Sequence, residues 1–257
     1  MPRTGLLDGK VALITGAGSG QGRAASLLFS EHGASIVVVD MNDETAAETV
    51  ALVQKNDGEP LACHADVSRP ADCNAMVHTA MAAYGHVDVL YNNAAVQMSG
   101  RLVDTSESDW DITIATNLSA IFWACRAAIP HMVEGDGGSI INTASVLGLI
   151  GSEGYAAYGA AKAGLVALTR QIAVEYGPKV RANVIAPGSI DTPRFRRVAA
   201  EMPDTDGFLE GLRNTIPAHR LGNADDIAKI ALFLASDESS YTSGAIVPCD
   251  GGLAAYR

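Results

Sequence analysis

Two tyrosines and one lysine lie close together in residues 154–164, which read GYAAYGAAKAG. A phenol has a pKa near 10, so it becomes a useful proton donor or acceptor at neutral pH only when a nearby cation favours the phenolate. On a helix, residues four apart have Cβ atoms about 5–6 Å apart, a spacing that pairs Tyr158 with Lys162. Tyr155 precedes the lysine by about 10 Å along a helix axis, at 1.5 Å per residue. The spacing therefore predicts that Tyr158 is the acid–base group and that Tyr155 lines the substrate pocket. Because Y-x-x-x-K also occurs by chance on many helices, this prediction depends on the motifs around it.

A glycine-rich turn occupies residues 11–22, VALITGAGSGQG, between a predicted strand and a helix expected from about residue 23 to residue 32. Its glycines are Gly16, Gly18, Gly20 and Gly22. Without Cβ atoms, such a turn lets backbone N–H groups approach a pyrophosphate at the positive end of a helix. The alternative is a tight turn with no ligand. The position between strand and helix favours a dinucleotide.

Asp40 closes the second predicted strand, about twenty residues after the turn, where a carboxylate accepts hydrogen bonds from the adenosine ribose. Its charge would repel the 2′-phosphate of NADP, and neither Ala17 nor Met41 supplies a cation. We therefore expect NAD as the cofactor. A solvated strand end is the alternative role for this carboxylate.

Seven β-branched runs are separated by longer segments, most of them with helical apolar spacing: KVALIT, ASIVVVD, PLACHAD, VDVLYNN, GSIINTAS, RANVIAPG and AIVPCDGG. This alternation predicts an α/β, doubly wound parallel sheet, the three-layer Rossmann fold. Helix starts are expected at Ser68, Ser106 and Asn223. No linker or repeat divides the chain, so we expect one NAD-binding catalytic domain over residues 1–257. Residues 191–214, interrupted by glycine and proline, are expected to form a substrate lid.

The formal net charge of −11 argues against a nucleic-acid or anionic-membrane partner. No apolar stretch approaches the ~20 residues of a membrane span, and MPRTGLLDGK lacks a signal-peptide core, so a cytoplasmic location is expected. The cysteines and histidines show no metal-ligand spacing, and we expect no metal.

Six motifs follow one another along the chain: TGAGSGQG at 15–22, NNAA at 92–95, Asn117, Ser145, Tyr158 with Lys162, and PGSIDT at 187–192. In this order and spacing the chain resembles the compact, single-domain members of the short-chain dehydrogenase/reductase family over essentially its whole length. Two positions depart from the family pattern. Ala95 stands where a glycine is usual, and Gln21 stands where an aliphatic residue is usual.

The resemblance implies that Tyr158 is the acid–base group and that Lys162 lowers its pKa and holds the nicotinamide ribose. It implies further that Ser145 positions the substrate oxygen and that Asn117 anchors a proton-relay water. Together with Ser145, Gln97 and Tyr155 are expected to contact substrate. Contacts to NAD are expected from Gly16, Ser19, Gly20, Gln21, Gly22, Asp40, Met41, Asp66, Val67, Asn93, Ala94, Ala95, Tyr158, Lys162, Pro187, Gly188, Ile190 and Thr192.

We therefore expect an NAD-dependent oxidoreductase that moves a hydride between the nicotinamide and a secondary alcohol or ketone. One alternative is a 3-oxoacyl thioester reductase, which Asp40 disfavours because such members usually prefer NADP. Another is a non-catalytic NAD(H)-binding sensor or scaffold on the same fold. The resemblance also implies a homotetramer. Arg194, Arg196 and Arg197 are expected on a solvated helix face, with a contact to an anionic substrate as the less favoured alternative.

Overall fold

The computed structural model describes residues 5–56 and 58–256. Residues 1–4, 57 and 257, which the expected domain range includes, lie outside the described residues. All seven predicted strands form and pair in parallel, in the order β3-β2-β1-β4-β5-β6-β9. Their bounds are β1 Val11–Thr15, β2 Ser35–Asp40, β3 Pro60–His64, β4 Val89–Asn92, β5 Gly138–Thr143, β6 Val180–Pro187 and β9 Ile246–Cys249. The expected doubly wound sheet is confirmed.

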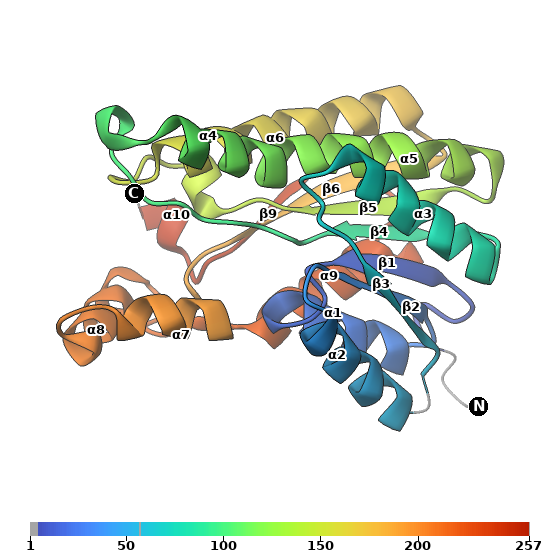
Figure 1. The fold of residues 1–257 in the computed structure, drawn as a ribbon, viewed down its shortest axis with the longest axis horizontal. Coiled ribbons are helices and arrows are strands. Elements are labelled where there is room, and N and C mark those ends of the chain that lie inside the picture. Colours follow the sequence, from blue (N-terminus) through green and yellow to red (C-terminus); the bar gives the residue numbers. More distant parts are fainter. Residues whose placement is uncertain (1–4, 57, 257) are drawn as a thin grey trace.

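Helices cover both faces of this sheet (Figure 1). One layer holds α1 (Gly20–Glu31), α2 (Asp43–Lys55) and α9 (Ala224–Ala235). The other holds α3 (Pro70–Tyr84), α4 (Glu107–Ile114), α5 (Ala120–Glu134) and α6 (Ala156–Tyr176). A short helix, α10 (Leu253–Tyr256), follows β9. This is the three-layer Rossmann arrangement.

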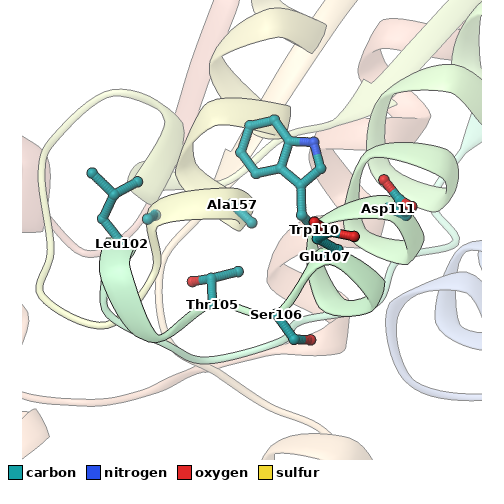
Figure 2. A pocket seen from close by; sticks show the side chains of 8 residues that line it. Leu102, Thr105, Ser106, Glu107, Trp110, Asp111 and Ala157 are labelled. Carbon is teal, nitrogen blue, oxygen red and sulfur yellow. The ribbon is translucent and has the colours of Figure 1, made fainter.

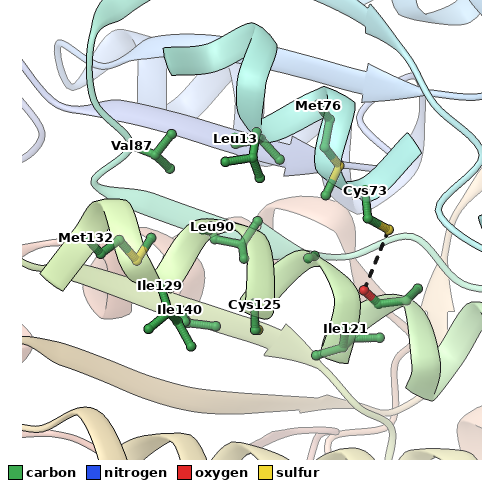
Figure 3. Close-up of a cluster of buried hydrophobic side chains, with 14 of the residues drawn as sticks. Leu13, Cys73, Met76, Val87, Leu90, Ile121, Cys125, Ile129, Met132 and Ile140 are labelled. Atoms are coloured by element: carbon green, nitrogen blue, oxygen red, sulfur yellow. Dashed lines mark hydrogen bonds between the residues drawn. The ribbon is translucent and has the colours of Figure 1, made fainter. Parts of the chain in front are cut away.

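Strand β1 shows why its sequence is apolar without interruption. Val11 and Leu13 pack into the cluster under α3 and α5, drawn in Figure 3, while Ala12 and Ile14 pack into the cluster under α1 and α9. Successive side chains of a strand point to opposite faces. A strand covered on both faces therefore buries every side chain, as β1 does.

Helix starts follow the expected cap residues closely but not everywhere. The Ser106 hydroxyl accepts a bond from Asp109 N at 3.0 Å, and Asn223 forms a full capping box with Asp226. The N-cap of α3 is Arg69 instead of Ser68, whose hydroxyl binds the Asp66 carboxylate. Helix α1 begins at residue 20 instead of about 23, so the glycine-rich turn itself contains the helix N-terminus.

One helical run, residues 107–134, is long and apolar enough to span a membrane by length and composition. It consists of α4, a π-helical turn (Ala115–Ser119) and α5, and it packs against α3 and α6. Its most apolar stretch is 50% buried inside the protein. We therefore assign it as a core helix of the fold.

Two helices, α7 (Pro193–Ala200) and α8 (Thr205–Thr215), lie together away from the sheet and its flanking helices (Figure 1). Two short strands, β7 (Ile190–Asp191) and β8 (Gly222–Asn223), pair in parallel where the chain leaves and re-enters the main body. Phe195 and Phe208 stack between the two helices, with ring centroids 6.5 Å apart. We call residues 192–221 the α7–α8 segment.

Candidate active site

The predicted site residues come together at the carboxyl edge of the sheet, where β1, β2, β4, β5 and β6 all end. The crevice outside this edge, where the strand order reverses, is where doubly wound folds bind their ligands. Strand β1 lies between β2 and β4 in the sheet, so the reversal occurs beside the glycine-rich turn.

The glycine-rich turn has a backbone shape that side chains would disrupt. Gly16 has φ +64°, and a Cβ at Gly22 would overlap the Gly16 carbonyl oxygen. Ser19 is the N-cap of α1 but uses no side-chain bond to cap it. Near Gly20 an added Cβ would meet the Thr192 methyl group at 3.4 Å. The free N–H groups at the start of α1 can therefore face a pyrophosphate, as the turn predicts.

Gln21 lies in this turn at one of the two positions that depart from the family pattern. Its side-chain oxygen Oε1 is buried without a hydrogen-bond partner among the described residues. Its backbone amide lies in the first turn of α1 and can still serve an anion. The Gln21 Oε1 atom is therefore available to accept a hydrogen bond from a ligand that binds beside the turn.

Asp40 lies at the end of β2 directly beside the glycine-rich turn. Its Oδ2 accepts a hydrogen bond from Gly18 N at 2.9 Å, and its Oδ1 accepts one from Asn42 N at 3.0 Å. A Cβ at Gly18 would come within 2.8 Å of Oδ2. The carboxylate is thus fixed and half-buried, while Met41 beside it is 66% exposed.

Arg23 is a nearby cation that the sequence analysis did not consider. Its guanidinium bonds to the Gly18 carbonyl and pairs with Glu48 at 2.7 Å. A third bond runs from its Nε to Thr49 Oγ1 at 3.0 Å. The charge of Arg23 is therefore already matched by a carboxylate. Its position near Gly18 follows from the packing of α1 on α2, which local motifs do not reveal.

The loop after β4 is tied to the glycine-rich turn through Thr15. The Thr15 hydroxyl accepts bonds from Asn93 N at 3.0 Å and Ala94 N at 3.1 Å, and Asn93 Nδ2 donates to Thr15 O at 3.1 Å. This bonding holds residues 93–95 against the turn. After β3, Asp66 is fixed by accepting bonds from Ser68, while Val67 packs against the core.

Asn117 lies fully buried in the π-helical turn between α4 and α5. Its Nδ2 donates to Val96 O and to Thr113 O, each at 2.9 Å, while its Oδ1 has no partner within residues 5–56 and 58–256. A buried amide oxygen without a partner is rare and indicates a site for an ordered water or a ligand. π-helical turns are frequent at functional sites, and this one was not foreseen from the sequence.

Ser145, Tyr158 and Lys162 form a buried cluster between β5 and α6. The Lys162 ammonium donates to Thr143 O at 2.7 Å and lies 5.6 Å from the centre of the Tyr158 ring. Tyr158 and Lys162 are four residues apart within α6, as the spacing requires. Tyr155 is the N-cap of this helix, and its backbone bridges to Gly100.

Burial raises the pKa of the Tyr158 phenol, while the charge of Arg194 and the Ser145 hydroxyl act in the opposite direction. Burial, and then the charge of Arg194, lowers the pKa of Lys162 from 10.5 to about 7. The expected lowering of the Tyr158 pKa by Lys162 is not found in the free protein: burial outweighs Arg194 and Ser145, and Lys162 is not among the groups that shift this pKa. Lys162 is itself poised between its charged and neutral forms near neutral pH.

The lowered pKa of Lys162 predicts a pH-dependent cost to folding. Between pH 7 and 10.5 the unfolded chain binds a proton at this residue that the folded protein does not, so stability rises with pH across that window. Below pH 7 the full cost is present, roughly 5 kcal/mol at 1.36 kcal/mol per pKa unit. Lys162→Met should therefore unfold at higher denaturant than the wild type at pH 6, and the difference should vanish near pH 10. A difference that is the same at both pH values would contradict this.

The loop after β6 closes the site from the other side. Gly188 N donates to Cys249 O at 3.0 Å, which fixes the turn after Pro187. Ile190 starts β7, and the Thr192 hydroxyl caps α7 by accepting a bond from Phe195 N at 3.3 Å. Thr192 thereby faces Gly20 across the crevice.

Arg194 does not lie on a solvated helix face, which corrects the favoured expectation. It is half-buried, and its Nη1 donates to Ala95 O at 2.9 Å and its Nη2 to Gln97 Oε1 at 2.8 Å. Its side chain reaches from α7 to the loop after β4. Arg196 and Arg197 are exposed, as expected.

A hollow of about 380 Å³ lies beside the cluster of Ser145, Tyr158 and Lys162. It is formed by the loop before α4, by α4 itself and by the start of α6 (Figure 2). Trp110 stands over it, and Glu107 and Asp111 give it acidic walls. Tyr158 and Lys162 do not line it. Across residues 5–56 and 58–256 there is no group of three or more potential metal ligands.

Comparison with known proteins assigns nearly the whole chain to one family. A family model described as enoyl-(acyl carrier protein) reductase matches residues 16–254. A solved structure described as a short-chain dehydrogenase/reductase from Burkholderia xenovorans superposes with a TM-score of 0.95 at 36% identity, covering 98% of each chain. The chain belongs to the short-chain dehydrogenase/reductase family.

Similar members of the short-chain dehydrogenase/reductase family carry different names. A 3-oxoacyl-[acyl-carrier-protein] reductase of Thermotoga maritima is 37% identical over 96% of this chain and 98% of its own. A 2,5-dichloro-2,5-cyclohexadiene-1,4-diol dehydrogenase of Sphingobium indicum is 39% identical over 96% of each chain. The structure of levodione reductase has a TM-score of 0.95 at 35% identity, covering 98% of this chain and all of that one.

Membership of the short-chain dehydrogenase/reductase family makes the protein an oxidoreductase that acts on an alcohol or ketone with a nicotinamide dinucleotide. The residues present fit that cofactor. The glycine-rich turn leaves room for a pyrophosphate, Asp40 is fixed beside it, and Gln21 keeps a buried acceptor unpaired.

Proposed function

We propose that the protein is an NAD-dependent dehydrogenase that interconverts a secondary alcohol and its ketone. The observation that carries the proposal is the buried cluster of Tyr158, Lys162 and Ser145, which lies at the same sheet edge as the glycine-rich turn. A phenol and an ammonium group buried together have no role in packing that an apolar pair would not fill better.

In this mechanism Tyr158 accepts the hydroxyl proton as the substrate's C–H bond breaks. Ser145 donates a hydrogen bond to the substrate oxygen and so holds it at the phenol. Arg194 and the Ser145 hydroxyl favour the phenolate. Lys162 would hold the nicotinamide ribose, and the Thr143 carbonyl fixes its ammonium group. The unpaired Oδ1 of Asn117 holds a water that carries protons to and from solvent. The bound nicotinamide supplies the hydride acceptor.

Asp40, Gly20 and Thr192 would hold the adenosine ribose, the pyrophosphate and the nicotinamide carboxamide. Residues 93–95, Asp66 and Val67 would flank the adenine. The proposal favours NAD over NADP because Asp40 is fixed beside the glycine-rich turn, where we expect the adenosine ribose, and the nearby Arg23 is already paired with Glu48.

Two other functions make different predictions. A 3-oxoacyl thioester reductase, the activity named for the Thermotoga maritima relative, would reduce 3-oxoacyl thioesters and would be expected to use NADPH. A non-catalytic NAD(H) sensor would bind cofactor without turnover. Incubation with NAD⁺ and a panel of cyclic, aromatic, aliphatic and sugar alcohols, with NADH absorbance as the readout, tests the dehydrogenase. Incubation with NADPH and a 3-oxoacyl thioester tests the reductase, and cofactor binding without turnover in either assay indicates the sensor. Absence of turnover across the alcohols, together with reduction of an acyl thioester by NADPH, would refute the proposal.

We infer that the α7–α8 segment, which extends the expected lid of residues 191–214, closes over bound substrate. Its two helices contact each other, and the segment bonds to the main body through Arg194 at one end and through Ala218 and Arg220 at the other. Lids are drawn from weakly packed segments and exclude water when they close. Amide hydrogen exchange should be fast in residues 193–215 of the free protein and slower with NAD plus a substrate analogue. Equal exchange in both states would contradict closure.

We also infer a homotetramer in the cytoplasm. Apolar side chains stay exposed on the core helical run, with Trp110 at 43% and Phe122 at 45%. Exposed apolar surface of this kind often marks a protein contact. Light scattering on the full chain would give the mass of the assembly, and a monomer would contradict this inference.

A further inference from the structure

Arg194 is a cation without an acidic partner at the catalytic cluster. Both of its hydrogen-bond partners, the Ala95 carbonyl and the Gln97 side-chain amide, are neutral. No carboxylate of the described residues lies within 4.0 Å of its guanidinium, whereas Arg196 on the same helix pairs with Asp191 at 2.6 Å. Arg194 is therefore a half-buried cation without an opposite charge beside it in the part of the chain that the structure describes.

The charge of Arg194 acts directly on the reacting groups. It is the second-largest influence on both Tyr158 and Lys162, and it lowers the pKa of each. Its guanidinium is therefore close enough for its charge to act on both groups. It also bonds Gln97, which the family resemblance assigns to the substrate pocket.

A carboxylate would be a better partner for Arg194 than the two oxygens it now holds. Hydrogen bonds between ionised groups are roughly twice as strong as neutral ones. The guanidinium fork also matches the two oxygens of a carboxylate in one plane. A substrate anion could therefore displace the Gln97 amide and draw α7 over the site.

The neighbouring hollow is unsuited to the same anion. Glu107 and Asp111 line it, and their charges would repel a carboxylate there. A 3-oxoacyl thioester offers only a neutral carbonyl two bonds from the ketone, so it would gain little from Arg194. The electrostatics favour a free acid.

We propose that Arg194 binds a carboxylate carried by the substrate, so that the enzyme acts on hydroxy acids and the corresponding oxo acids. This rests on the proposed dehydrogenase function and specifies its substrate class. The other anion within reach would be the cofactor pyrophosphate, and the experiment separates the two.

The test measures binding of two oxo acids, 3-oxobutanoate and 4-oxopentanoate, and of their amides to the enzyme with NAD⁺, by calorimetry; the oxidised cofactor has no hydride to transfer to a ketone, so binding is measured without turnover. The amides have nearly the same shape without the charge. At least one acid should bind tenfold or more tightly than its amide in the wild type. Arg194→Gln should remove this preference, and Arg194→Lys should retain part of it. Arg197→Gln, which removes an exposed charge from the same helix, is the matched control and should keep it.

Titration of NADH alone into each variant shows whether Arg194 binds the substrate carboxylate or the cofactor pyrophosphate. An unchanged dissociation constant in Arg194→Gln supports a substrate contact. A loss of NADH affinity that accounts for the whole effect would assign Arg194 to the pyrophosphate and overturn the proposal. Equal binding of acids and amides to the wild type, or a preference that survives Arg194→Gln, would also overturn it.

The alcohol panel keeps this proposal distinct from the proposed function. Turnover of neutral alcohols without any acid preference would leave the dehydrogenase standing and remove the role of Arg194. Selective binding of an acid without turnover of any alcohol or oxo acid would support the carboxylate site and remove the dehydrogenase.

Discussion

Tyr158→Phe should lower kcat by at least about a hundredfold, the usual scale for loss of a positioned acid–base group. The substitution removes only the hydroxyl and keeps a ring that is 7% exposed, so the fold should be unaffected. NADH should still bind, because the glycine-rich turn and Asp40 are untouched. Stopped-flow or steady-state rates with an alcohol found in the panel, together with an NADH titration, measure both quantities.

Tyr155→Phe is the matched control, since it removes the same atom from a tyrosine at the start of the same helix. Tyr155 is half-buried and raises the pKa of Tyr158, so its hydroxyl lies near the site without being placed at the lysine. Its loss should change mainly KM. If the two variants lost kcat equally, the assignment of Tyr158 as the acid–base group would be wrong.

The second large effect concerns the choice between NAD and NADP. A hydrogen bond from the ribose to the Asp40 carboxylate would contribute roughly 1.5–3 kcal/mol, and the phosphate of NADP would replace it with repulsion. We expect kcat/KM to favour NAD by at least about a hundredfold, nearly 3 kcal/mol. Asp40→Ala should shrink this ratio mainly by weakening NAD use.

Adding Met41→Arg to Asp40→Ala should improve NADP use, because residue 41 is exposed beside the ribose position. Asp43→Ala is the control, since its side chain is 80% exposed at the start of α2 and pairs only with His64. Steady-state kinetics with both cofactors decides the matter. Equal use of NADP by the wild type would show that Asp40 does not face the ribose.

The sequence was sufficient to predict the sheet because the central strands β1, β2 and β4 are apolar on both faces and helical segments connect successive strands. It was also sufficient to pair Tyr158 with Lys162, since four residues on one helix fix their separation whatever the surroundings. The π-helical turn at Asn117 was not predictable, because nothing in ATNLS distinguishes it from an ordinary helix. The carbonyl of Val96 that holds Asn117 comes from another segment of the chain.

Arg194 shows why longer-range contacts escaped prediction. Its partners Ala95 and Gln97 lie almost a hundred residues earlier, and only the position of α7 brings them together. When only the neighbouring residues in PRFRR are considered, an arginine there is predicted to be exposed to solvent. Arg23 was missed for the same reason, because its pairing with Glu48 depends on how α1 packs on α2.

The pairing of β7 with β8 fixes both ends of the α7–α8 segment at one place on the main body. Ile190 lies opposite Gly222 and Asp191 opposite Asn223, so the chain returns to the point from which it left. When the two ends of a chain segment are already held together, the entropic cost of lengthening the segment grows only slowly with the number of residues. The residues that follow Arg194 in this segment can therefore be lengthened or exchanged for those of a relative while Thr192 and Arg194 are kept. A fold with such a strand pair can acquire new substrates through changes in one segment while its cofactor-binding crevice stays constant.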